Sequence, residues 1–174
     1  GDNLYKKTEK KVFSKLKKMS GHNNVVAMQG SGSLALEIVA LNFLFGKVLI
    51  VSTGYYSDRL YDLTVKAKKT NKYVKSIKKI DWKLMSKIKE KYDWVWACPT
   101  ETSCGLKLPI KYLKNLARRT KAKLALDATA SFGLESDHKL SDVVSFSSCK
   151  GLFGLTGASF ICYNNTPKNK VNSF

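Results

Sequence analysis

Short apolar segments that alternate with helical segments constrain the fold of this chain more than any other feature. Seven of them read as β-strands, at residues 25–29, 47–51, 73–77, 94–98, 123–128, 143–147 and 158–163. Such alternation predicts an α/β fold with three layers, in which helices cover both faces of a mostly parallel sheet and ligands bind at the carboxyl ends of the strands. Lys150 and the last segment are joined by a link too short for a parallel crossover, so we expect the seventh strand to be antiparallel.

The helices between these strands are expected at residues 4–19, 34–45, 57–69, 81–92 and 109–120. Asp81 is a suitable cap for the fourth helix, and Pro109 suits the first turn of the fifth. A chain of 174 residues is long enough to bury its own core. The sequence therefore predicts one domain that folds as a unit.

The chain is strongly basic, with a net charge of +18 from 31 lysines and arginines against 13 acidic residues. Only Arg59, Arg118 and Arg119 are arginines. Specific nucleic-acid recognition favours arginine forks interleaved with aromatic residues in a compact patch, and no such patch is present. We therefore expect the lysines to form a solvated surface and expect no specific nucleic-acid partner; a non-specific polyanion site is the alternative that the charge leaves open.

Cysteine and histidine usage argues against metal sites and disulfides. The four cysteines are too scattered for a zinc knuckle or a disulfide framework. His22 and His138 lie in polar, turn-like segments without ligand spacing, so both are expected at the surface and no metal site is expected. No apolar run approaches the roughly 20 residues of a membrane span, and the N-terminus lacks a signal-peptide core. We expect a cytoplasmic protein with no membrane partner.

A glycine- and serine-rich turn, Gly30-Ser31-Gly32-Ser33, connects the first strand to the first helix that follows it. Free amides and the positive dipole end at a helix start suit a phosphate, and two serine hydroxyls add donors. This pattern predicts a phosphate cradle. Serine is also a common helix cap without any ligand, so the turn alone is a weak signal.

Lys150 follows the sixth strand directly, within the stretch Ser145 to Phe160. A lysine in a low-dielectric, glycine-lined setting can lose its proton near neutral pH and attack a carbonyl group. Gly151, Gly154 and Gly157 would let the backbone approach a flat ligand closely. In a lysine-rich chain one lysine can also fall after a strand by chance, so the interpretation depends on the residues upstream.

Polar and aromatic side chains follow three other strands at the same edge of the predicted sheet. Tyr56 follows the second strand, Thr102 follows the fourth, and Asp127 lies at the C-terminal end of the fifth. Together with Lys150 and residues 31–33 they supply a ring-stacking aromatic, a carboxylate, an amine and a phosphate cradle. These are the parts needed to hold pyridoxal phosphate.

At these residues the chain resembles the large domain of the fold-type I pyridoxal-phosphate enzymes, specifically the class V aminotransferases. The resemblance is ordered and covers nearly the whole chain. Four motifs carry it: Gln29-Gly-Ser-Gly-Ser33, Glu101-Thr-Ser-Cys-Gly105, Asp127-Ala-Thr-Ala-Ser-Phe-Gly133 and Ser147-Ser-Cys-Lys-Gly151. Within the class they are most similar to the 2-aminoethylphosphonate–pyruvate transaminases, and next to the serine/alanine–glyoxylate aminotransferases.

The resemblance implies a role for each residue that would contact the cofactor ring. Lys150 would hold pyridoxal 5'-phosphate as a Schiff base and move the substrate's proton. Asp127 would pair with the pyridine nitrogen, and Thr129 would lie against the ring. Tyr56 would stack on the ring face, and Thr102 would approach the side of the ring hydroxyl.

At the phosphate end the resemblance implies contacts from Ser31, Gly32 and Ser33. Two positions depart from the family pattern. Cys149 stands where the family usually has an amide side chain that also helps to bind the phosphate, and Ser57 replaces a usual glycine after the stacking aromatic. Both changes are expected to weaken cofactor contacts.

The implied reaction is transfer of the amino group of 2-aminoethylphosphonate to pyruvate, in a homodimer whose ligands are a small-molecule amine donor and a 2-oxo acid acceptor. The alternatives are a serine/alanine–glyoxylate-type aminotransferase, another class V enzyme such as a cysteine-desulfurase relative, and a truncated, non-catalytic domain that binds the cofactor or polyanions.

Members of the family are longer than this chain. The resemblance implies that residues 1–164 are the cofactor-binding large domain with an incomplete N-terminal arm. Residues 165–174 would then begin a linker to a C-terminal small domain, which in the family carries a substrate-anchoring arginine. The sequence leaves open whether this chain turns over substrate by itself.

Overall fold

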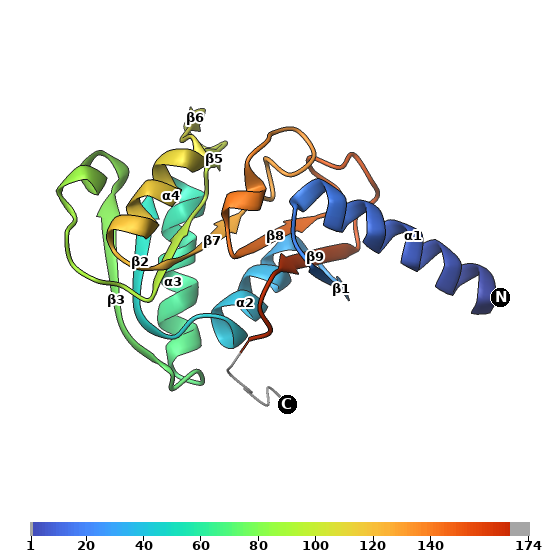
Figure 1. Cartoon of the computed structure of the whole chain (residues 1–174), viewed down its shortest axis with the longest axis horizontal. Helices are drawn as coiled ribbons and strands as arrows, with labels where there is room; N and C mark the ends of the chain where they lie inside the picture. Colours follow the sequence, from blue (N-terminus) through green and yellow to red (C-terminus); the bar gives the residue numbers. More distant parts are fainter. Residues whose placement is uncertain (1, 168–174) are drawn as a thin grey trace.

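A seven-stranded sheet in the order β1-β9-β8-β7-β4-β2-β3 forms the centre of the computed structural model, which describes residues 2–167 (Figure 1). All strands are parallel except β9, which is antiparallel to both of its neighbours. The strands are β1 (Asn24–Gln29), β2 (Gly46–Ser52), β3 (Val74–Asp81), β4 (Trp94–Ala97), β7 (Lys123–Asp127), β8 (Val143–Ser147) and β9 (Ala158–Tyr163). The predicted α/β fold, with its mostly parallel sheet and antiparallel last strand, is confirmed.

In the described residues, four α-helices lie between or before these strands: α1 (Asp2–Ser20), α2 (Gly32–Asn42), α3 (Tyr55–Lys68) and α4 (Ile110–Arg119). Two short 3-10 helices follow β3 and precede β8, η1 (Trp82–Lys87) and η2 (His138–Leu140). A small hairpin that the sequence did not predict, β5 (Thr100–Glu101) and β6 (Leu106–Lys107), follows β4 at the carboxyl edge of the sheet.

Two hydrophobic cores lie on opposite faces of the sheet, because side chains alternate along each strand. On β4, Trp94 and Trp96 point into the core that α2 and α3 cover. Val95 and Ala97 of the same strand point into the core on the other face, where α4 and the end of α1 pack. β4 is buried on both faces, as expected for an interior parallel strand, and the three layers follow from this double burial.

The predicted helix over residues 81–92 is wrong. Strand β3 continues to Asp81, whose side chain accepts a hydrogen bond from Lys83 N, and only the short η1 follows. Trp82, Met85 and Ile88 pack against the core at a spacing of three residues, which is the period of a 3-10 helix. Asp81 is a cap as expected, but of a different kind of helix.

The expectation that His22 and His138 lie at the surface is also wrong. Both are 3% exposed. The two ring nitrogens of His22 lie 3.0 Å from Ser20 O and 2.9 Å from Ser141 O, and His138 Nε2 lies 2.9 Å from Ser131 Oγ. The segment after α1 packs against the segment around η2, and this contact buries the histidines.

Strand β9 ends at Tyr163, close to the expected end of the large domain at residue 164. Most of the expected linker at 165–174 lies outside the described residues. Within residues 2–167, none of the helices combines the length and the apolar character needed to cross a membrane.

Candidate active site

A cavity of about 480 Å³ opens at the carboxyl edge of the sheet. Its volume lies in the range of small-molecule binding sites. All nine residues predicted to form the site line it: Ser31, Gly32, Ser33, Tyr56, Thr102, Asp127, Thr129, Cys149 and Lys150. They come from five segments that follow β1, β2, β4, β7 and β8, so the topology of the sheet brings them together. Their roles toward a cofactor stay predictions.

The start of α2 forms one end of the cavity. Ser31 is the residue before the helix, and its side chain makes no capping bond, so its hydroxyl is left to a ligand. Gly32 is buried beneath this turn. A Cβ added there would lie 3.3 Å from Thr129 Oγ1 and 3.5 Å from Ser147 Cβ, so a side chain at this position would crowd the floor of the cavity. In the first turn Leu34 N donates to Ser31 O at 3.0 Å, which leaves the amides of Gly32 and Ser33 as the donors that an anion at this helix start would meet.

Asp127 ends β7 at the centre of the cavity and is 5% exposed. Its Oδ1 accepts hydrogen bonds from Thr129 N at 3.0 Å and Thr129 Oγ1 at 2.6 Å. Burial raises the pKa of this carboxyl, while the bonds from Thr129 and the charge of Arg59 act in the opposite direction. Within the described residues Oδ2 receives no hydrogen bond. Because Asp127 lines the cavity, a ligand bound there can supply a donor to this oxygen.

Lys150 lies at the cavity wall immediately after the loop that leaves β8. Its backbone oxygen accepts from Phe153 N at 2.9 Å, which holds the loop in a turn. The side chain is exposed and makes no hydrogen bond or ion pair with the residues that the structure describes. The expected low-dielectric setting is therefore not found around this amine, which is free to reach a ligand in the cavity.

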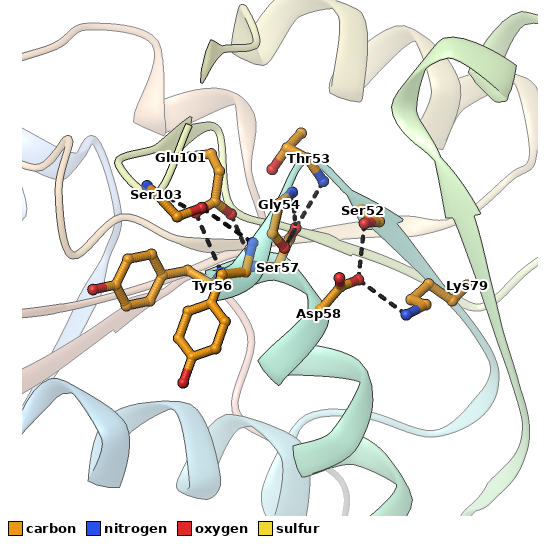
Figure 2. A network of polar contacts seen from close by, with 10 residues as sticks. Ser52, Thr53, Gly54, Tyr56, Ser57, Asp58, Lys79, Glu101 and Ser103 are labelled. Carbon is orange, nitrogen blue, oxygen red and sulfur yellow. Dashed lines mark hydrogen bonds and ion pairs between the residues drawn. The ribbon is translucent and has the colours of Figure 1, made fainter. Parts of the chain in front are cut away.

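Tyr56 stands on the first turn of α3, and Glu101 fixes the start of that helix (Figure 2). Glu101 is fully buried. Its Oε1 accepts from Tyr56 N at 3.2 Å, and its Oε2 accepts from Ser57 N at 3.0 Å. Ser103 Oγ donates to Oε1 at 2.5 Å. Glu101 thus caps α3 from another segment of the chain and sets the position of the tyrosine.

The serine that replaces a family glycine, Ser57, points away from the cavity. Its Oγ accepts hydrogen bonds from Thr53 N at 2.7 Å and Gly54 N at 2.9 Å, and it donates to Gly54 O at 2.8 Å. The hydroxyl therefore holds the turn between β2 and α3. This local role explains how serine is accommodated at the position.

Six further residues line the cavity that the sequence did not single out as site residues: Leu36, Arg59, Cys98, Thr100, Ala130 and Ser147. Arg59 is the notable one, because its Nη2 donates to Ser33 Oγ at 3.2 Å. Its position one turn after Tyr56 on the same helix was the available signal.

A family model and solved structures both match this chain. A family model described as Aminotransferase class-V matches residues 2–174. Comparison with curated protein sequences finds no match. Among solved structures, alanine–glyoxylate aminotransferase from Nostoc sp. superimposes with a TM-score of 0.78 at 22% identity, over 93% of this chain and 48% of that chain.

Two other solved structures are similar. Pyridoxamine–pyruvate aminotransferase from Mesorhizobium loti gives a TM-score of 0.74 at 22% identity, over 89% of this chain and 42% of that chain. A phosphoserine aminotransferase from Cytophaga hutchinsonii gives 0.72 at 20% identity, over 90% and 45%. At these identities the likeness is one of fold, and the chain spans less than half the length of each of the three structures.

Proposed function

We propose, from the premise that this chain belongs to the class V aminotransferase family, that it is the cofactor-binding part of a pyridoxal-phosphate-dependent aminotransferase. The observation that carries this proposal is the convergence of the Lys150 amine, the buried Asp127 carboxylate and the start of α2 on one cavity. Residues 1–164 would be the large domain, and 165–174 the beginning of a linker.

The residues present fit pyridoxal phosphate. A Cβ at Gly32 would press on Thr129 Oγ1, so glycine keeps the backbone at the start of α2 close to the floor of the cavity. Thr129 bonds only Oδ1 of Asp127, so Oδ2 can accept from a donor in the cavity, as a protonated pyridine nitrogen requires. When bound, this cofactor supplies an aldehyde and an electron-withdrawing ring that stabilises negative charge on the carbon beside an amine.

Each side chain then has a defined task. Lys150 Nζ would provide the amine that holds the aldehyde and would afterwards carry a proton. Asp127 would hold the ring nitrogen protonated. The hydroxyls of Ser31 and Ser33 and the free amides at the start of α2 would bind the phosphate. Tyr56, whose backbone Glu101 holds, would lie against the ring.

The substrates are an amine donor and a 2-oxo acid acceptor. The four motifs support 2-aminoethylphosphonate and pyruvate as the pair, in a cytoplasmic homodimer. A serine/alanine–glyoxylate-type reaction is the second candidate, and the similarity in fold to the Nostoc alanine–glyoxylate enzyme favours it.

A single-turnover experiment tests the proposal. The purified chain is loaded with pyridoxal phosphate, freed of excess ligand and mixed separately with 2-aminoethylphosphonate, alanine or serine. Formation of pyridoxamine phosphate is followed by chromatography. We expect conversion with at least one donor, and none in Lys150→Ala, whereas Lys139→Ala, which removes an exposed lysine outside the cavity, should behave as wild type.

The outcomes separate the parts of the proposal. Bound cofactor that no donor converts would contradict amino transfer by this chain. Conversion by Lys150→Ala at the wild-type rate would contradict the role of the lysine. Faster conversion with 2-aminoethylphosphonate than with alanine or serine would support the phosphonate assignment, and the reverse order would support the second candidate.

A further inference from the structure

Arg59 lies in the wall of the cavity, where few other side chains carry positive charge. Among the described residues that line the cavity, the cationic side chains are Arg59 and Lys150. Lys150 is committed to the aldehyde end in the proposed function. Arg118 and Arg119, the other arginines of the chain, lie at the end of α4 and do not line the cavity. Arginine is the side chain whose planar fork matches phosphate oxygens.

The hydrogen bond between Arg59 and Ser33 orients the phosphate cradle. Because Arg59 Nη2 donates to Ser33 Oγ at 3.2 Å, that oxygen acts as an acceptor and its own proton is left to point elsewhere. A hydroxyl held in this way can donate to a phosphate at the start of α2. The guanidinium has five N–H donors in all, and this bond uses one of them.

The other side chain at this end is a weak donor. Cys149 stands where the family usually has an amide, and its Sγ lies 3.7 Å from Ser147 Oγ. A thiol donates poorly to a phosphate. Arg59 forms no ion pair within 4 Å with the described residues, although its charge acts on the Asp127 carboxyl across the cavity.

We propose that Arg59 is a phosphate-binding residue of the cofactor site, contributed by α3 to the cradle at the start of α2. Its guanidinium neutralises the phosphate directly and sets the Ser33 hydroxyl as a donor to it, which compensates for the missing amide at position 149. This inference rests on the proposed function, since the phosphate is that of the cofactor.

A neighbouring hollow supplies the control. A space of about 220 Å³ that shares Ser33, Leu36 and Arg59 with the main cavity is also lined by Asp62, Leu63 and Lys66. Lys66 is an exposed cation on the same helix and does not line the main cavity. Lys66→Met therefore removes the same unit of charge from α3 without touching the cradle.

The test compares two ligands that differ only in the phosphate. Dissociation constants of pyridoxal 5'-phosphate and of pyridoxal are measured by visible absorption for wild type, Arg59→Met, Arg59→Lys and Lys66→Met. For Arg59→Met we expect about tenfold weaker binding of the phosphate ester, the loss of one charge-assisted hydrogen bond, with pyridoxal within about twofold of wild type. The dissociation constant of Arg59→Lys for the phosphate ester should fall between those of wild type and Arg59→Met. Lys66→Met should change the dissociation constant of neither ligand by more than about twofold.

Equal weakening of both ligands in Arg59→Met, or equal effects of Arg59→Met and Lys66→Met, would overturn the inference. Thermal unfolding of each variant confirms that the comparison is made on folded protein. If wild type forms no covalent adduct with either aldehyde, the proposed function fails, and calorimetry with pyridoxine 5'-phosphate and inorganic phosphate then tests Arg59 separately. Weaker binding of these by Arg59→Met supports the assignment, and no binding by wild type overturns it.

Discussion

Replacement of Glu101 by glutamine tests how the start of α3, and with it Tyr56, is held. Glutamine keeps the shape and one acceptor oxygen, which can serve the bonds now made by Oε1. Its amide nitrogen then takes the place of Oε2 and faces Ser57 N–H, which Oε2 accepts at 3.0 Å (Figure 2). One hydrogen bond to a charged acceptor is lost and a buried donor is left unpaired.

The loss of a hydrogen bond to a charged group, with a buried partner left unsatisfied, costs about 3 kcal/mol. This is a large part of the roughly 5–15 kcal/mol that stabilises a typical domain. We therefore expect Glu101→Gln to lower the free energy of unfolding by about 3 kcal/mol. Urea unfolding at pH 7, followed by the fluorescence of the three tryptophans, measures it.

Asp58→Asn is the matched control, because it removes one carboxylate from the same turn of α3. Asp58 accepts from Ser52 Oγ at 2.8 Å and pairs with Lys79 at 3.0 Å, but both charged side chains are 40% or more exposed. A pair so exposed contributes about 0.5 kcal/mol. A Glu101→Gln variant within about 0.5 kcal/mol of wild type, or no less stable than Asp58→Asn, would refute the capping role.

The pH dependence of the free energy of unfolding is a second test of Glu101→Gln. Burial by itself raises the pKa of Glu101, but the hydrogen bonds from Ser103, Ser57 and Tyr56 outweigh it, so the pKa lies below its ordinary value of 4.5. The ionised carboxylate therefore adds stability above pH 4.5, and this is lost as the pH falls through the lower folded value. Glu101→Gln should lose this acid-side dependence.

Three further predictions concern other parts of the molecule. Asn71→Ala removes two buried hydrogen bonds, to Ala40 O and Leu44 O, that tie the end of α2 and the residues after it to the turn before β3, and a part-buried one from Tyr73 N within that turn. It should lower the free energy of unfolding by about 3 kcal/mol in urea. Burial lowers the pKa of His22 and His138 below 6.5, so below that pH the unfolded chain binds protons that the folded chain does not. The free energy of unfolding should therefore fall between pH 7 and 5.5, by up to about 1.4 kcal/mol per pH unit for each histidine. A flat pH profile of stability would contradict this. Burial raises the pKa of the Cys162 thiol to about 11, so a disulfide reagent should modify it only after unfolding, whereas Cys149 should react in the native protein and be protected by pyridoxal phosphate.

The sheet was predictable because its five inner strands, β2, β4, β7, β8 and β9, are short apolar runs of mostly buried residues. The helix expected at 81–92 was not, since Trp82, Met85 and Ile88 repeat every three residues amid lysines, and the chain turns away from the sheet after one short 3-10 helix. The sequence analysis predicted an α-helix there, whereas these apolar residues have the three-residue period of a 3-10 helix.

The cavity residues were predictable because each follows a strand at the same edge of the sheet. The residues that the sequence could not place depend on distant contacts. His22 is buried by a bond to Ser141, 119 residues away, and Arg59 reaches Ser33 across 26 residues. No local pattern records such a pairing, because each partner lies among polar neighbours that also suit an exposed loop or helix.

The most direct test is to find which lysine captures the cofactor. The chain is mixed with an equimolar amount of pyridoxal phosphate, reduced with borohydride, digested and mapped by mass spectrometry, with Lys150→Ala treated in parallel. We predict one dominant adduct, on the peptide that contains Lys150, and its loss in the variant. Adducts spread over the many exposed lysines, with Lys150 modified no more than the others, would contradict the assignment of the cavity as a pyridoxal-phosphate site.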